Sequence, residues 1–429
     1  MKCIKLTAKT QQSLLDTLLK RSPNHYGQYE SVVAEIIANV RANGDSAVFE
    51  YTKKFDGWDA SPDTIRVTEA EIEEAFAQAE PAFIEVMKHS AANIIAFHEK
   101  QLQKSWIDTK PDGSILGQKI QPIAISGVYV PGGKAAYPSS VLMNVLPAKV
   151  AGIKKIIMTT PAGADGKVNA GTLTAAKIAG VDEIYKVGGA QAIAAMAFGT
   201  ERIPKVDKIT GPGNIFVALA KKACFGYVSI DSIAGPSEIL VLADESANPR
   251  YVAADLLSQA EHDELASAIL ITTSETLAEE VSRQIEGFLK ELPRADIIQK
   301  SLEQYGYILL ANSMEDAISA ANAIASEHLE ILTKDPYEVM TKIENAGAIF
   351  LGEYSSEPLG DYYAGPNHIL PTNGTARFFS PLNVDDFMKK TSIISYSKEA
   401  LFKAHEDIEL FAVKEGLTAH ANSIKVRFE

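Results

Sequence analysis

From Gly127 onward the chain alternates short apolar stretches with glycine-containing turns and longer amphipathic segments. Three stretches and their turns are Val128-Tyr129-Val130 with Pro131-Gly132-Gly133, Glu183–Val187 with Gly188-Gly189, and Lys208-Ile209-Thr210 with Gly211-Pro212-Gly213-Asn214. The segments between them have helical length, and Gly180 stands where the helix expected over 170–179 would end. Strands separated by such helices form βαβ units, in which the strands are parallel. This part of the chain therefore predicts an open parallel sheet.

A second series of the same kind occupies the C-terminal half of the chain. Its strands are expected at 267–272, 307–310, 328–332 and 348–351, with helices that begin near Glu275 and Ser313. Helical periodicity also covers most of residues 10–105 and returns after Pro381. The predicted fold class is α/β, with two open parallel-sheet Rossmann-like domains and helical N-terminal and C-terminal extensions.

A chain of 429 residues is too long for a single hydrophobic core. The expected divisions are an N-terminal helical segment at 1–25, a first α/β domain made of 26–126 and 238–381, a second α/β domain at 127–237, and a C-terminal helical tail at 382–429. The first domain is discontinuous because the segment with the glycine turns interrupts it.

The charge and cysteine content exclude several classes of protein. A formal net charge of -14 without a basic run argues against binding to nucleic acid or to an anionic membrane. No apolar run reaches the roughly 20 residues that span a bilayer, and the N-terminus lacks the apolar region of a signal peptide. The two cysteines, Cys3 and Cys224, cannot form a disulfide framework. We therefore expect a cytoplasmic protein.

The three glycine turns have a functional and a structural interpretation. Glycine lets the backbone approach a ligand closely, and a helix N-terminus offers free N–H groups to an anion. A phosphate-bearing cofactor is therefore a plausible ligand. No Gly-x-Gly-x-x-Gly fingerprint is present in the usual place, and tight strand-to-helix turns need glycine for their own sake. Three such turns in one domain favour the ligand.

Gln259 and His262 are the strongest candidates for metal ligands. They are expected near the end of a helix that Asn248 caps and Pro249 begins, and their spacing of three would place them on one helix face. An amide oxygen and an imidazole nitrogen are half of a zinc site, which Glu327-His328, Asp361 or His420 could complete. The alternative is a histidine that interacts only with the helix dipole.

Glu327 and His328 place a carboxylate and an imidazole side by side where a helix gives way to a strand. These groups are the usual means of proton transfer, although a capping or solvated pair is the alternative. The remaining histidines are expected to be structural or solvated, with His368 the most ambiguous. They are His25, His89, His98, His368 and His405.

Seven co-linear motifs resemble those of the histidinol dehydrogenase family over about residues 25–426. The motifs are Gly127-Val128-Tyr129-Val130-Pro131-Gly132-Gly133, Val187-Gly188-Gly189-Ala190-Gln191-Ala192-Ile193-Ala194, Lys208-Ile209-Thr210-Gly211-Pro212-Gly213-Asn214, Ala234-Gly235-Pro236-Ser237-Glu238, Leu257-Ser258-Gln259-Ala260-Glu261-His262, Ser326-Glu327-His328-Leu329 and Leu417-Thr418-Ala419-His420. The resemblance implies oxidation of L-histidinol to L-histidine with two NAD and one water, through a bound aldehyde, as the last step of histidine biosynthesis.

The resemblance also implies roles for individual residues. One Zn²⁺ per subunit would be held by Gln259, His262, Asp361 and His420, while Glu327 and His328 would be the acid/base pair. The implied NAD contacts are Tyr129, Gln191 and Asn214, and the implied substrate contacts are Ser237, Gln259, His262, His328, Asp361, Glu415 and His420. The zinc and acid/base residues would thus lie mostly in the first α/β domain and NAD in the second. A homodimer is implied, in which each C-terminal tail reaches the partner's active site.

Two other functions use the same residues. A zinc hydrolase would use these ligands with Glu327 as its base and would not need NAD. The three glycine turns and the absence of His-Glu-x-x-His count against it. A relative without catalytic activity is expected to lack one of the ligands or acid/base residues, and none is missing.

Overall fold

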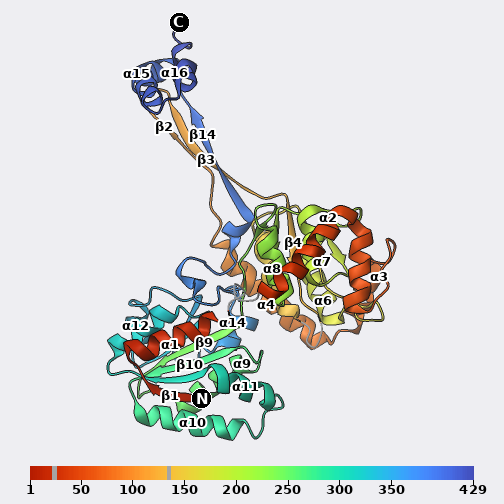
Figure 1. Ribbon diagram of the computed structural model, residues 1–429, viewed down its shortest axis with the longest axis vertical. Helices are drawn as coiled ribbons and strands as arrows, with labels where there is room; N and C mark the ends of the chain where they lie inside the picture. Colours follow the sequence, from red (N-terminus) through yellow and green to blue (C-terminus); the bar gives the residue numbers. More distant parts are fainter. Residues whose placement is uncertain (22–26, 133–136) are drawn as a thin grey trace. The chain divides into compact units, whose positions relative to one another are not determined.

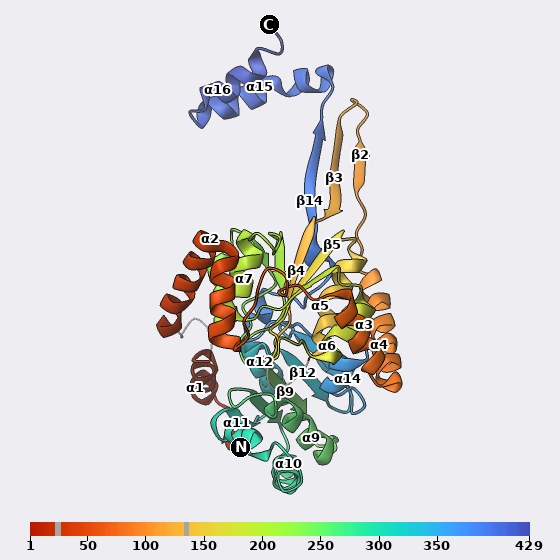
Figure 2. The same cartoon turned by 90° about the vertical axis from the view of Figure 1, so that its right-hand side faces the viewer.

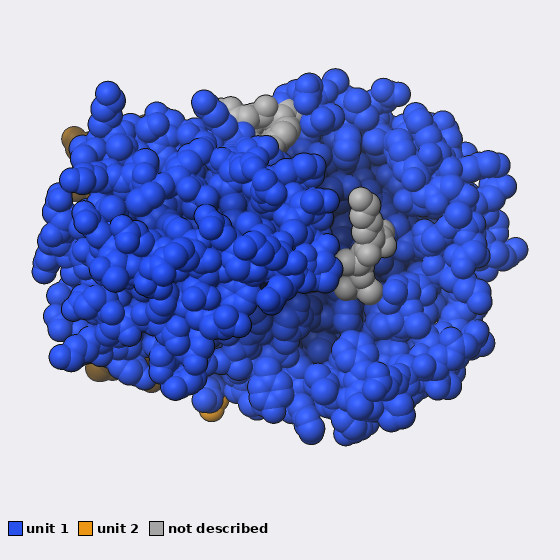
Figure 3. Space-filling view, turned by 90° about the horizontal axis from the view of Figure 1, so that it is seen from below, with its two compact units in different colours: residues 1–101, 124–387 blue, residues 102–123, 388–429 orange. Residues whose placement is uncertain are grey.

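The computed structural model describes residues 1–21, 27–132 and 137–429, which form two compact units. Unit 1 comprises residues 1–101 and 124–387, and unit 2 comprises residues 102–123 and 388–429 (Figure 3). Within the described residues, unit 1 contains two parallel sheets and unit 2 contains one antiparallel sheet. His25 and Gly133, both considered above, lie outside the described residues.

Five parallel strands form the first sheet of unit 1, in the order β6-β5-β4-β7-β8. Their bounds are β4 (Ile125–Tyr129), β5 (Lys155–Thr159), β6 (Glu183–Tyr185), β7 (Lys208–Thr210) and β8 (Ser229–Ile230). β4 is central, because Tyr129 pairs with Thr159 of β5 and Val128 pairs with Thr210 of β7. Since all the strands run the same way, the glycine turns that follow β4, β6 and β7 meet at one edge of the sheet.

Helices cover both faces of this sheet, with α2 and α7 on one side and α5 and α6 on the other (Figure 2). The helices around it are α2 (Gly27–Asp56), α3 (Glu69–Gln78), α4 (Pro81–Glu99), α5 (Pro138–Val150), α6 (Ala170–Ala179), α7 (Gly189–Phe198) and α8 (Ile215–Cys224). α7 is rich in alanine, and its small buried side chains let α2 and α8 pack closely against it. α6 ends as expected, with Gly180 in the left-handed region at φ 76°.

Six parallel strands form the second sheet of unit 1, in the order β1-β11-β10-β9-β12-β13. Figure 1 labels β1, β10 and β9 of this sheet. They are β1 (Lys2–Lys5), β9 (Glu238–Ala243), β10 (Ser267–Thr272), β11 (Gly306–Leu310), β12 (His328–Leu332) and β13 (Ala348–Leu351). Every residue of β9 is buried, because both of its faces are covered. Leu240 and Leu242 face the core under α1 and α12, while Ile239 and Val241 face the core under α9, α10 and α11. The helices of this half are α1 (Ala8–Leu19), α9 (Pro249–Ala260), α10 (Glu275–Phe288), α11 (Ala295–Tyr305), α12 (Met314–Ile324), α13 (Pro336–Met340) and α14 (Glu357–Tyr362).

Unit 2 consists of a three-stranded antiparallel sheet and two helices that pack against each other. Its elements are β2 (Trp106–Thr109), β3 (Ile115–Pro122), β14 (Met388–Ser395), α15 (Lys398–Lys414) and α16 (Thr418–Lys425). Several large apolar side chains of α15 are exposed, Phe411 to 69% and Leu410 to 58%. No helix among the described residues of the chain is long and apolar enough to cross a membrane.

The two parallel sheets confirm the predicted fold class, and several expected elements have the bounds given by the sequence. β10, β12, β13 and α6 coincide with their expected ranges, and Asn248 caps α9 as expected, with Pro249 as its first residue. The central strand β9 was not anticipated. Its signal is present, since Ile239–Ala243 is an apolar run that Asp244 ends, and such a run is typical of a strand buried on both faces.

The chain ends depart from the purely helical extensions expected. Residues 1–25 were expected to be helical, but they begin with β1, which pairs with β11 (Cys3 with Ile308). The tail from 382 was also expected to be helical, but it first forms β14, which pairs along its length with β3. Four-residue edge strands such as β1 are too short to show a clear period.

The packing of the N-terminal helices also differs from the expected division. Residues 26–126 were expected to belong with 238–381, but α2, α3 and α4 pack on helices of the five-stranded sheet. α1 instead contributes Leu14 and Leu18 to the core of the six-stranded sheet. Periodicity shows that a helix has an apolar face but does not show which sheet that face covers.

Candidate active site

The expected acid/base pair lies at the amino edge of the six-stranded sheet, around the first residue of β9. The backbone N–H of Glu238 donates to Oε2 of Glu327 at 2.9 Å, and Nδ1 of His328 donates to the backbone carbonyl of Glu238 at 2.9 Å. A carbonyl can only accept, so Nδ1 carries the proton in the neutral ring and Nε2 is left as an acceptor. Nε2 of His328 has no hydrogen-bond partner among the described residues and lies 3.9 Å from Glu357 Oε1.

Burial acts on this pair in opposite directions. It raises the pKa of Glu327 well above its ordinary value, and the nearby carboxylate of Glu238 adds to the rise. It lowers the pKa of His328, which favours the neutral ring. Burial thus favours the neutral form of both groups, an uncharged carboxyl and an uncharged imidazole.

A candidate metal site lies beside this pair. His262, Glu357 and Asp361 each offer a ligand atom, and these atoms all lie within 4.8 Å of one another. Glu357 and Asp361 are four residues apart on α14, so they share a face of that helix. Gln259, in the last turn of α9, is 1% exposed, and its Oε1 has no hydrogen-bond partner among the described residues. Imidazole nitrogen with carboxylate and amide oxygens, one of them buried and unpaired, is a donor set that fits Zn²⁺.

The two carboxylates on α14 differ in their electrostatics. Burial, together with the nearby Asp361, raises the pKa of Glu357 to about 9. Burial would also raise the pKa of Asp361, but His368, whose Nδ1 is 3.5 Å from Asp361 Oδ1, outweighs it together with His328 and holds the pKa at about 2. Asp361 is thus the ionised member of the pair and the better ligand for a cation.

Two sequence expectations about this site change. Gln259 and His262 were expected on one face of a helix, but α9 ends at Ala260, and His262 follows in a turn closed by its N–H to the Gln259 carbonyl at 3.2 Å. Glu357 was not among the expected residues. Its spacing of four from Asp361 in a short segment opened by Ser356 was the available signal. His368 was thought more consistent with a structural role, and its contact with Asp361 places it at the candidate site.

The expected NAD contacts gather at the carboxyl edge of the five-stranded sheet. Tyr129 is the last residue of β4, and its hydroxyl accepts the Gly189 N–H at 3.1 Å. Asn214 caps α8, where its Oδ1 accepts from Phe216 N at 3.1 Å and Val217 N at 3.2 Å. Gln191 lies in the first turn of α7, is 1% exposed, and neither of its polar side-chain atoms has a partner among the described residues. A buried amide without partners is a site for a polar ligand.

A cavity of about 450 Å³ opens beside this edge, next to Gly132 and Pro161. Asp56 lines it, and burial raises the pKa of Asp56 to about 6 although its carboxylate accepts a hydrogen bond from Gly188. Gly211 has φ 118°, and a side chain there would collide with the Tyr129 carbonyl. Glycine is therefore required in this turn for backbone packing, as well as for any ligand.

Three more of the expected residues lie elsewhere. Ser237 immediately precedes β9, and its carbonyl accepts the Ser267 N–H at 3.0 Å. Glu415 and His420 belong to unit 2, at the end of α15 and in the first turn of α16, and both are exposed. The group around His262 forms within unit 1 without them.

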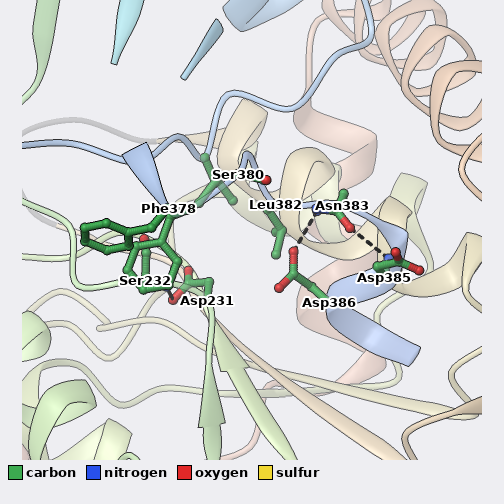
Figure 4. Close-up of a pocket in the computed structure, with 10 residues that line it drawn as sticks. Asp231, Ser232, Phe378, Ser380, Leu382, Asn383, Asp385 and Asp386 are labelled. Atoms are coloured by element: carbon green, nitrogen blue, oxygen red, sulfur yellow. Dashed lines mark hydrogen bonds between the residues drawn. The ribbon is translucent and has the colours of Figure 1, made fainter. Parts of the chain in front are cut away.

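A separate cavity of about 340 Å³ contains none of the expected site residues (Figure 4). Asn383 and its neighbours form its wall: Asn383 N donates to Asp386 Oδ2 at 3.0 Å, and Asp385 N donates to Asn383 Oδ1 at 2.8 Å. These bonds keep the polar groups occupied within the loop itself, so we assign no chemistry to this cavity.

Comparison with known proteins identifies the family of the chain. A family model described as histidinol dehydrogenase matches residues 19–428. The chain is 58% identical over 400 residues to a histidinol dehydrogenase of Halalkalibacterium halodurans, covering 93% of this chain and 94% of that relative. It is 55% identical over 424 residues to one of Listeria monocytogenes, covering 99% of both. A crystal structure of histidinol dehydrogenase from Elizabethkingia anophelis has a TM-score of 0.92 at 38% identity, covering 100% of this chain and 98% of that one. The chain belongs to the histidinol dehydrogenase family.

Proposed function

We propose that this enzyme oxidises L-histidinol to L-histidine with two NAD and one water, through a bound aldehyde, as the last step of histidine biosynthesis. The observation that carries the proposal is the pairing of Glu327 and His328 on one peptide, beside a group of metal-binding side chains. The family matches along the whole chain support the same reaction.

His328 takes the proton of the substrate hydroxyl in the first oxidation. Its Nδ1–H is held by the Glu238 carbonyl, so Nε2 is the free acceptor, and burial lowers its pKa so that the ring is neutral. NAD, when bound, accepts the hydride in each of the two oxidation steps. Glu327 activates water for attack on the aldehyde, and its pKa, raised by burial, makes the carboxylate a stronger base than an exposed glutamate.

Zn²⁺, when bound, would orient the substrate's imidazole and amine and increase their electrostatic attraction to the site. Gln259, His262 and Asp361 would hold it in unit 1, and His420 would complete the set. Glu357 lies within the same group, so it either joins the ligands or hydrogen-bonds to Asp361.

NAD binds at the glycine turns of the five-stranded sheet. Tyr129, Gln191 and Asn214 surround these turns, and Gln191 has two unpaired polar atoms to offer. The buried Tyr129 hydroxyl has a pKa raised to about 12 by burial, so it remains a neutral hydrogen-bonding group.

In a homodimer with exchanged tails, Glu415 and His420 would serve an active site. They lie in unit 2, whose helix α15 exposes apolar side chains suited to a protein partner. In the dimer each tail would supply His420 to the metal and Glu415 to the substrate of the other subunit. We place the enzyme in the cytoplasm, since both cysteines are free.

The test is NADH formation from L-histidinol, measured before and after chelation and again after zinc is restored. Two NADH per histidinol, lost on chelation and regained with zinc, would support the proposal. His328→Asn and Glu327→Gln should each lower kcat by about two to four orders of magnitude. Fully metallated protein that makes no NADH would refute it.

A further inference from the structure

The amino edge of the six-stranded sheet contains a buried ion pair, Arg21 and Glu238, that is not among the residues proposed above to bind substrate or cofactor. Arg21, just beyond α1, is 1% exposed, and its Nη2 lies 2.5 Å from Glu238 Oε1. Its Nη1 donates to the Leu265 carbonyl at 2.7 Å. The guanidinium thus joins the start of β9 to the loop that precedes β10.

Glu238 is the residue whose backbone holds both acid/base groups. Its N–H binds the Glu327 carboxylate and its carbonyl binds the His328 ring, each at 2.9 Å. A displacement of this one peptide would therefore move both groups together. The side chain of Glu238 is fixed from two sides, by Arg21 on Oε1 and by the Asn373 N–H on Oε2 at 3.2 Å.

A buried ion pair contributes little stability compared with apolar side chains of the same size, so its presence calls for another explanation. The guanidinium of Arg21 fixes the orientation of the Glu238 side chain as well as compensating its charge, because its two terminal nitrogens bind two separate acceptors, the Leu265 carbonyl and the Glu238 carboxylate. Without it, Glu238 would be a buried carboxylate lacking its cation, next to the carboxylate of Glu327.

We propose that Arg21 and Glu238 are positioning residues for the Glu327–His328 pair, which they hold through the backbone of Glu238. This inference rests on the proposed function and deepens it, because it gives the segment after α1 a part in proton transfer. Arg21 is 217 positions from Glu238 in the sequence, so helix α1 and β9 are brought together only by the fold.

The test uses the full-length, zinc-loaded enzyme with Arg21→Met, Arg21→Lys and Glu238→Gln. Loss of the pair should lower kcat by about ten- to a hundredfold, the effect expected when catalytic groups move by about 1 Å. The KM values for histidinol and NAD should change little, since Arg21 is 1% exposed and is not among the proposed ligand contacts. Arg21→Lys should recover part of kcat, because it keeps the charge without the fork.

Leu14→Ala is the matched control, since Leu14 anchors the same helix α1 in the same core but lies outside the ion pair. It should lower the thermal midpoint while leaving kcat unchanged. If folded Arg21→Met has the kcat of Leu14→Ala, the proposal is overturned.

A second measurement does not depend on turnover. In protein labelled with ¹⁵N-histidine, the ring signal of His328, assigned with His328→Asn, should shift in Arg21→Met and Glu238→Gln but not in Leu14→Ala. An unchanged signal would overturn the positioning role even if the wild-type enzyme made no NADH. A wild-type enzyme without activity, with the signal shifted as expected, would refute the proposed function alone.

Discussion

Gln191 should reduce the stability of the free enzyme, because it is buried without partners. Its side-chain Oε1 and Nε2 both lack hydrogen-bond partners among the described residues, and the residue is 1% exposed. An unsatisfied buried polar group costs about 1–3 kcal/mol. Methionine has a similar length and helix propensity and needs no partner. Gln191→Met should therefore raise the free energy of unfolding by about 2 kcal/mol.

The assay is thermal unfolding by circular dichroism without NAD, together with NAD titration by calorimetry. A gain of about 2 kcal/mol corresponds to a rise of a few degrees in the midpoint for a protein of this size. NAD affinity should fall by about tenfold or more, since the ligand loses the hydrogen bonds of the amide. Stability gained at the expense of binding is the expected sign of a functional residue.

Gln78→Met is the matched control, because Gln78 is exposed at the end of α3 and bonds only Glu74, at 3.1 Å. It should change stability by less than about 0.5 kcal/mol and leave NAD affinity unchanged. A Gln191→Met enzyme that is less stable than wild type, or that binds NAD as tightly, would show that Gln191 has a structural partner after all.

Three further predictions concern the two edges. Asn214→Ala removes the cap of α8 and should cost about 1 kcal/mol of stability, measured by urea unfolding, and it should raise the KM for NAD. The folded pKa of Asp56 is raised from 3.8 to about 6, so its carboxylate lowers stability increasingly as pH rises through that interval and fully above it. Asp56→Asn should accordingly raise the free energy of unfolding by about 1 kcal/mol at neutral pH, a figure that allows for the partial exposure of Asp56. Below the ordinary pKa of an aspartate the substitution should not change the free energy of unfolding. Chelation should lower the thermal midpoint of the wild-type enzyme and zinc should restore it, whereas His262→Ala should have the low midpoint in both conditions.

The grouping of residues at the carboxyl edge of the five-stranded sheet was largely predictable from the sequence. Tyr129, Gln191 and Asn214 each stand beside a glycine turn, and parallel strands bring such turns to a common edge whatever the distance along the chain. The glycine turns and the rule that parallel strands end at one edge therefore suffice to predict that these three residues lie at the same edge of the sheet. The roles of these three residues stay predictions.

The geometry at the amino edge of the six-stranded sheet was less predictable, because it depends on contacts between segments that are distant in the sequence. Glu327 and His328 were noticed as a pair, but their common support is the peptide of Glu238, in a strand the sequence analysis did not anticipate. Arg21 reaches this peptide from a segment whose fold was uncertain from sequence. Periodicity identifies faces of helices and strands, but it does not identify which distant side chain fills the end of a sheet.

The buried carboxylates at the amino edge of the six-stranded sheet differ in the cation that would compensate their charge. The carboxylate of Glu238 is compensated by the guanidinium of Arg21, whose Nη2 lies 2.5 Å from Glu238 Oε1. At the other end Glu357 and Asp361 face each other, with imidazoles as their closest basic partners. Burying carboxylates is costly unless a cation or a proton compensates them. The permanent guanidinium suits Glu238, which has to stay in one place to hold the acid/base pair. An exchangeable metal ion would suit the carboxylates of Glu357 and Asp361 on α14, and loss of that ion should make α14 less stable while the Arg21–Glu238 pair stays intact.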